Sequence, residues 1–130
     1  MSALPAITVA EEDYNRLSAV LDKLTEFTET TDQLETELSR AELIPLAEMP
    51  DDVVTMNSTV RFLNEDTRQE NELELVYPHE FEPNGRHVSI LAPAGAAMLG
   101  LSIGESIEWQ VKGRPSLHLK IVGVTRKTPA

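Results

Sequence analysis

Residues 89–105, SILAPAGAAMLGLSIGE, change within one segment from a β-prone run to a short helix and then to a turn. Pro93 suits the first turn of a helix, where no amide donor is needed, and Gly100 suits the position just after the last turn. The segment therefore predicts a strand over 88–91 and a helix over 93–99. Because this helix is small, apolar and contains glycine, it is either part of the core or a surface that packs closely against a partner.

On both sides of this helix, β-prone runs alternate with turn residues. The predicted strands cover residues 53–56, 59–63, 72–77, 107–111 and 117–124. In the last of them, apolar residues alternate with His118 and Lys120, which predicts one buried and one solvated face. Together with the strand over 88–91, these runs predict an antiparallel sheet with one short helix packed on it, which is an α+β fold.

The first part of the chain has helical rather than strand periodicity. Apolar residues recur at spacings of three and four, at Tyr14, Leu17, Leu21 and Leu24 and again at Leu34, Leu38 and Ala41. Thr8 with Glu11 is a candidate capping box for the first helix, and Asp32 is a candidate cap for the second. We predict an antiparallel helical hairpin, a short coiled coil, with helices over 9–27 and 32–43 and a tip near 28–32. The first helix would be about 28 Å long at about 1.5 Å per residue.

Negative charge is concentrated in this hairpin. The chain has a net charge of −11, and residues 1–52 hold thirteen acids and three bases. We therefore divide the chain into an acidic hairpin, 1–50, and a nearly neutral domain, 51–130. An acidic surface repels phosphate backbones, so we expect no strong direct binding of nucleic acid. It would attract a basic or metal-bearing partner; the alternative is that the charge only keeps a solvated surface soluble.

Composition also bears on the compartment. The chain has no cysteine, which excludes disulfides, cysteine-rich zinc sites and thiol nucleophiles. Its longest apolar stretch, 90–104, is interrupted by Pro93 and is shorter than the roughly 20 residues of a membrane helix. The N-terminus has neither the basic nor the apolar region of a secretory signal. We predict a cytoplasmic protein that does not contact a membrane.

Patterns typical of catalysis are missing from the sequence. His79, His87 and His118 lack the spacing of a metal site, and there is no nucleophile elbow or phosphate-binding glycine loop. We therefore predict no catalytic residue, no metal site and no cofactor, with each histidine at an ordinary surface position. Trp109 alternates with Ile107 and Val111, which predicts a core position.

Glu29 and Asp32 stand out at the predicted hairpin tip, in a segment that is otherwise rich in threonine. Two carboxylates on a protruding tip are suited to share a divalent ion with another macromolecule. The alternative is that Asp32 caps the second helix and Glu29 is simply solvated. Of the two interpretations we favour the second, in which Asp32 caps the helix and Glu29 is solvated.

Three motifs carry a family resemblance. DVVTMNSTV (52–60), LVYP (75–78) and SILAPAGAAMLGLSIGE (89–105) resemble the family of regulators of nucleoside diphosphate kinase, bacterial relatives of the Gre transcript-cleavage factors. The resemblance covers roughly residues 10–125. It implies an FKBP-like C-terminal domain after a helical hairpin shorter than that of the Gre factors. It also implies binding to RNA polymerase at the mouth of the secondary channel.

The resemblance further implies roles for individual residues. The Gre hairpin enters the channel, where acidic tip residues help to hold a catalytic magnesium of the polymerase; Glu29 and Asp32 match these acids only in chemical type. The Gre C-terminal domain docks outside the channel, in part through the region that matches 89–99 here. The candidate docking residues are therefore Pro93, Ala94, Met98 and Leu99.

These observations predict a polymerase-binding, non-enzymatic regulator of transcription elongation that competes with Gre factors. A shortened hairpin should not support robust transcript cleavage, because every lost residue removes about 1.5 Å of reach. The link to nucleoside diphosphate kinase would be indirect, since the sequence has no phosphate-binding loop or phospho-accepting histidine motif. Two alternatives are a peptidyl-prolyl isomerase, suggested by the FKBP-like fold, and an adaptor that binds the kinase directly.

Overall fold

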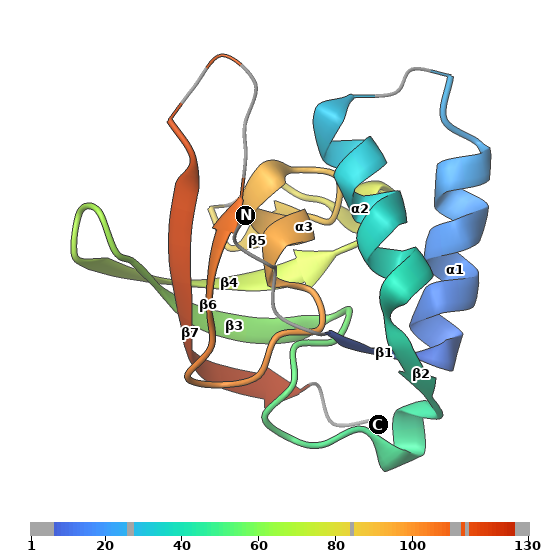
Figure 1. Cartoon of the computed structure of the whole chain (residues 1–130), viewed down its shortest axis with the longest axis horizontal. Coiled ribbons are helices and arrows are strands. Elements are labelled where there is room, and N and C mark those ends of the chain that lie inside the picture. Colours follow the sequence, from blue (N-terminus) through green and yellow to red (C-terminus); the bar gives the residue numbers. More distant parts are fainter. Residues whose placement is uncertain (1–6, 26–27, 84, 110–112, 114, 127–130) are drawn as a thin grey trace.

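The computed structural model describes residues 7–25, 28–83, 85–109, 113 and 115–126. Its first part contains two helices of similar length, each flanked by a three-residue strand. The order is β1 (Thr8–Ala10), α1 (Glu11–Asp22), α2 (Glu29–Arg40), β2 (Glu42–Ile44) and a 3-10 turn, η1 (Leu46–Glu48). The two helices lie side by side and run in opposite directions (Figure 1). β1 and β2 pair in parallel and hold the helix ends that lie away from the connection.

The first predicted helix, 9–27, is longer than α1, and the second, 32–43, is shifted by three residues relative to α2. Pairing between distant segments of the chain sets the start of α1 and the end of α2. Residues 8–10 and 42–44 form the β1–β2 pair instead of extending the helices. The predicted capping box of Thr8 and Glu11 is therefore wrong, because Ala10 precedes α1 and makes no side-chain cap. Thr28 caps α2, with its hydroxyl accepting from the Thr31 amide. Residues 26–27, the end of the first predicted helix, lie outside the described part.

A five-stranded sheet forms the second part of the molecule, in the order β5-β4-β3-β7-β6. The strands are β3 (Ser58–Asn64), β4 (Gln69–Val76), β5 (His87–Ser89), β6 (Ser106–Trp109) and β7 (Leu117–Arg126), with a 3-10 turn η2 (Pro78–Glu80) after β4 and a helix α3 (Pro93–Met98) after β5. The fold is thus a mixed one of helices and sheet, as predicted. The described residues give no strand over 53–56, where Val53 makes a single bridge to Ser102. Residues 110–111, at the end of another predicted strand, are not among those described.

The prediction of a wholly antiparallel sheet is wrong at one edge. β5 pairs in parallel with β4, with Leu75 opposite Val88. The reason is the connection between them: η2 and the residues after it carry the chain back along the sheet before β5 begins. The other three pairings of the sheet are antiparallel.

The helices and the sheet share one hydrophobic core. α3 lies between the two longer helices and the sheet and packs against α2, β5, β6 and β7 (Figure 1). The core joins residues from both parts of the chain, among them Leu17, Leu34, Leu75, Met98, Trp109 and Ile121. Trp109 is buried, as predicted. The acidic helices therefore lie against α3 and the sheet, with their apolar faces covered.

Among the described residues, no helix has both the length and the apolar character needed to span a membrane.

Candidate functional site

The helix α3 presents only part of its predicted docking surface. Pro93 and Ala94 are half-buried, as are Leu91 and Ala92 just before the helix. Met98 and Leu99 are 0% and 2% exposed and belong to the core. The expectation that these two residues contact a partner is wrong for this structure, because α3 turns them inward. Residues 91–94 are the part of the segment that a partner can reach, and we call them the α3 entry.

Asp32 lies on the second turn of α2 and is exposed. Because Thr28 occupies the cap of this helix, the interpretation of Asp32 as the cap is wrong. Glu29 is the first residue of α2, and its side chain lies outside the described part. Within the described part of the chain, no group of three or more His, Asp or Glu side chains gathers as a metal site.

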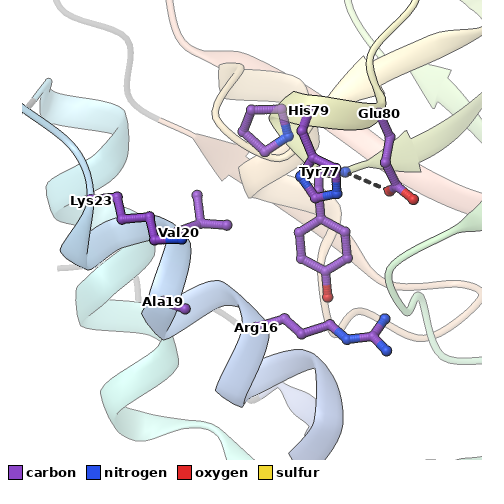
Figure 2. Close-up of a pocket in the computed structure, with 8 residues that line it drawn as sticks. Arg16, Ala19, Val20, Lys23, Tyr77, His79 and Glu80 are labelled. Atoms are coloured by element: carbon purple, nitrogen blue, oxygen red, sulfur yellow. Dashed lines mark hydrogen bonds between the residues drawn. The ribbon is translucent and has the colours of Figure 1, made fainter.

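A cleft between α1 and η2 is a feature that the sequence analysis missed. It has a volume of about 600 Å³. One wall is α1 and the other is the segment that follows β4 (Figure 2). The lining residues are Arg16, Ala19, Val20, Lys23, Tyr77, Pro78, His79 and Glu80. The chemistry of the cleft is therefore mixed, with two cations and two apolar side chains on one wall, and two rings, a proline and an acid on the other.

Buried hydrogen bonds hold the two walls of this cleft together. Asp13 is 6% exposed, and its carboxylate accepts from the Met56 amide at 3.1 Å and from the Tyr77 hydroxyl at 3.5 Å. Glu80 accepts from the Tyr77 amide at 3.2 Å and from the side-chain amide of Asn57 at 2.9 Å. Asn57 itself has a left-handed backbone, with φ of 64°. The network thus joins α1, the segment before β3, and η2.

The rings on the second wall form an ordered stack. The centroids of Tyr77 and His79 are 5.9 Å apart and their planes differ by 16°. Tyr77 is buried and His79 is exposed. Burial raises the pKa of the Tyr77 hydroxyl, and the nearby Asp13 carboxylate adds to this effect, so the hydroxyl stays protonated and continues to donate. The stack is therefore fixed in the core at one end and accessible at the other.

Burial also raises the pKa of the Asp13 carboxyl above its ordinary value, and the hydrogen bond from the Met56 amide opposes this only in part. Asp13 therefore keeps its proton to a higher pH in the folded state than in the unfolded chain. The contribution of Asp13 to the free energy of unfolding therefore falls as pH rises from about 4 through the folded-state pKa, and the loss is complete above it.

We expect Asp13→Asn to abolish this pH dependence, because asparagine does not titrate. Its single amide oxygen can accept from only one of the two donors, so the loss of a hydrogen bond costs stability equally at every pH. The stability of the variant relative to the wild type should therefore rise between pH 4 and pH 7. Urea denaturation at both pH values measures the difference, in which contributions from the other acids cancel. A difference in stability between the two proteins that stays the same at pH 4 and pH 7 would contradict the assignment.

The sequence contains the residues of this network in separate motifs, and no local pattern links them. Met56 and Asn57 lie in one of the three motifs that carry the family resemblance, and Tyr77 and Pro78 lie in another. Asp13 was counted only as one of many acids. Its role depends on a contact with a residue 43 positions away, which local periodicity does not reveal.

The histidines differ in their surroundings. His79 stacks on Tyr77, whereas the ring nitrogens of His118 lie 2.9 Å from the Asp66 carboxylate and 3.3 Å from that of Glu108. The hydrogen bond with Asp66 raises the pKa of His118 above its ordinary value. His87 accepts from the Glu82 amide at 3.1 Å. Of the three, only His79 lines the cleft.

Comparisons with known proteins agree with this architecture. Residues 49–126 match the family of the transcription elongation factor GreA/GreB, C-terminal part, and residues 5–44 match the Rnk N-terminus. The chain is 37% identical over 119 residues to a "Regulator of nucleoside diphosphate kinase" of Escherichia coli K12, covering 91% of this chain and 88% of the relative. A solved structure of a "Prokaryotic transcription elongation factor GreA/GreB" from Nitrosomonas europaea is 45% identical, with a TM-score of 0.76 over 93% of this chain and 98% of the other.

The GreA relatives share a smaller region. Transcription elongation factor GreA of Rhodospirillum rubrum is 33% identical over 81 residues, which is 62% of this chain and 52% of GreA. These relatives are named as regulators or transcription factors. With an Rnk N-terminus followed by a GreA/GreB C-terminal part, the chain belongs to the family of regulators of nucleoside diphosphate kinase, which is related to the GreA/GreB elongation factors.

Proposed function

We propose that the protein binds RNA polymerase in the cytoplasm and regulates transcription elongation, docking at the secondary channel in competition with Gre factors. In this proposal the sheet and α3 act as an FKBP-like docking domain, and α1 with α2 acts as a short coiled-coil prong. The observation that carries the proposal is the GreA/GreB C-terminal match combined with two helices of only 12 residues each.

The length of the helices sets the predicted outcome of binding. A helix of 12 residues is about 18 Å long. This is shorter than the length that the sequence pattern predicts, and the apolar faces of both helices are used to cover the core. A prong of this length supports binding at the channel mouth without robust stimulation of transcript cleavage.

The charge of the helical part and the exposure of the α3 entry indicate different roles for these two regions in binding polymerase. The helical part carries most of the net charge, which favours approach to a basic channel mouth and raises the association rate more than the affinity. The α3 entry is the accessible apolar part of the segment implicated in docking. We propose that affinity comes from this surface.

Capture of core RNA polymerase by the immobilised protein tests the proposal. We expect Ala94→Asp to weaken capture roughly tenfold, because it places a charge in a contact that excludes water. Ala47→Asp, which makes the same change at an exposed position in η1, should leave capture unchanged. Equal capture by the two folded variants would contradict docking through the α3 entry, and no capture by the wild type would contradict the proposed function.

A transcript-cleavage assay on arrested complexes tests the role of the prong. The protein should compete with a Gre factor and inhibit its cleavage, without stimulating cleavage by itself. Strong cleavage that is lost in Glu29→Gln or Asp32→Asn would show that the tip acids act at the polymerase active site and would overturn this part of the proposal. We also propose that the link to nucleoside diphosphate kinase is indirect; copurification of the kinase without polymerase would contradict it.

A further inference from the structure

We propose that the cleft between α1 and η2 binds a small aromatic anion of nucleotide size. The inference does not depend on polymerase binding, because the cleft residues are separate from the α3 entry, to which the proposed function assigns the affinity for polymerase. It rests on three features of the cleft: its cations, its stacked rings, and the hydrogen bonding of its one carboxylate.

The cations of the acidic part are concentrated at this cleft. Residues 1–52 contain three bases, and Arg40 is paired with Glu37 on α2. The other two, Arg16 and Lys23, both line the cleft. They are seven residues apart, so they lie on one face of α1 with an axial separation of about 10.5 Å. In a chain of net charge −11, an anion is attracted to this position and repelled from the rest of the helical surface.

The opposite wall is suited to a planar group. Tyr77 and His79 are already stacked, and Tyr77 is held in place by its bond to Asp13. The exposed His79 ring is therefore an ordered platform on which a further ring can stack. Ala19, Val20 and Pro78 supply the apolar surface around it. Figure 2 shows the rings facing the α1 residues across the cleft.

Glu80 is the one acid among the described residues that line the cleft, and its position reduces its repulsion of an anion. Its carboxylate oxygen accepts from the Tyr77 amide and the Asn57 side chain, on the side away from α1 (Figure 2). Asp13 is buried below Tyr77 and its raised pKa reduces its charge at mildly acidic pH. At the exposed rim, two cations and the His79 ring therefore stand beside one acid, Glu80, whose Oε1 is already bonded.

The volume of the cleft and the polarity of its rim favour a small ligand over a peptide segment. A volume of about 600 Å³ is within the range of sites that enclose one small molecule. Most of the rim is polar and exposed, including Arg16, Lys23, His79 and Glu80. A docked peptide needs a wider apolar surface around the cleft. Together, ring stacking and two separated cations match a nucleotide, in which a planar base is joined to a chain of phosphates.

Calorimetric titration with ATP, adenosine and tripolyphosphate tests the inference. The protein is the full chain, and divalent cations are left out so that its many acids do not recruit metal. We expect saturable binding of ATP that is at least about tenfold tighter than binding of either fragment, because base and phosphates each contribute. The ATP affinity should fall as salt is raised.

Variants of the two walls make the test specific. Lys23→Gln and His79→Ala should each weaken ATP binding by about threefold to tenfold. Lys120→Gln, the same charge change on β7, should leave it unchanged. Equal binding of tripolyphosphate and ATP, an equal effect of Lys120→Gln, tighter binding of an acidic peptide than of ATP, or no saturation at millimolar ATP would each overturn the inference.

The polymerase capture assay distinguishes a loss of ATP binding from a loss of the proposed polymerase binding. Lys23→Gln and His79→Ala should retain capture by core polymerase while ATP binding weakens. Loss of both activities together would show that the cleft is part of the polymerase surface and would overturn its assignment as a separate ligand site.

Discussion

Replacing Gly95 with alanine is expected to destabilise the protein by more than about 3 kcal/mol, the scale of severe overpacking. Gly95 lies in α3, where the helix crosses the end of β5. A Cβ atom there would lie 2.1 Å from the carbonyl oxygen of Ser89 and 2.9 Å from its carbon. Both atoms are backbone, so no flexible side chain can move to make room.

Two effects of this substitution have opposite signs, and their sizes decide the outcome. Alanine is favoured over glycine inside a helix by about 1 kcal/mol. The steric overlap can be relieved only by moving α3 away from β5. α3 contributes Ala96, Ala97 and Met98 to the core, so this movement opens packing on both sides of the helix. The overlap therefore outweighs the gain in helix propensity.

Urea denaturation followed by circular dichroism measures the effect. Gly123→Ala on β7 is the matched control, because its nearest contact would be the Arg61 side chain at 3.4 Å and its backbone is not left-handed. The control should stay within about 1 kcal/mol of the wild type. A Gly95→Ala protein of equal stability would show that α3 does not pack on Ser89 as described.

Met98→Asp should have an effect of similar or greater size. Met98 is fully buried, and an ionised carboxylate in its place would have no partner among the apolar residues of the core. The cost is expected to exceed about 4 kcal/mol, or to force the carboxyl to keep its proton. Met98→Leu, which conserves volume, should cost less than about 1.5 kcal/mol.

This prediction changes how docking experiments are interpreted. If Met98→Asp lost polymerase capture, thermal unfolding would show the loss to be one of folding. Ala94→Asp tests the surface itself, because Ala94 is only half-buried. A folded Met98→Asp protein with wild-type stability would contradict the core position of Met98.

Local patterns were sufficient for many elements of this fold. The proline at the start and the glycine just after the end predicted α3 closely, and Gly100 does have the left-handed backbone that ends a helix, with φ of 82°. The alternation in β7 placed Leu119 and Ile121 in the core and left His118 half-exposed. These features depend on neighbours within a few residues, so the sequence carries them directly.

Other features depend on segments that are far apart in the chain. The β1–β2 pair joins residues 34 positions apart and moves the start of α1 and the end of α2 inside the predicted ranges. Packing between α3 and the rest of the core decides that Met98 is buried while Ala94 is accessible, although both are small or apolar residues of one short helix.

The sequence by itself determined the class of fold, the family and the acidic character of the helical part, because composition, periodicity and motifs are local properties. Only the tertiary structure decided the parallel pairing of β5, the accessible part of α3 and the cleft lined by Arg16, Lys23 and His79. The buried Asp13 carboxylate joins α1 to Met56 and to Tyr77 beside this cleft, and contacts between such distant residues have no periodic signature.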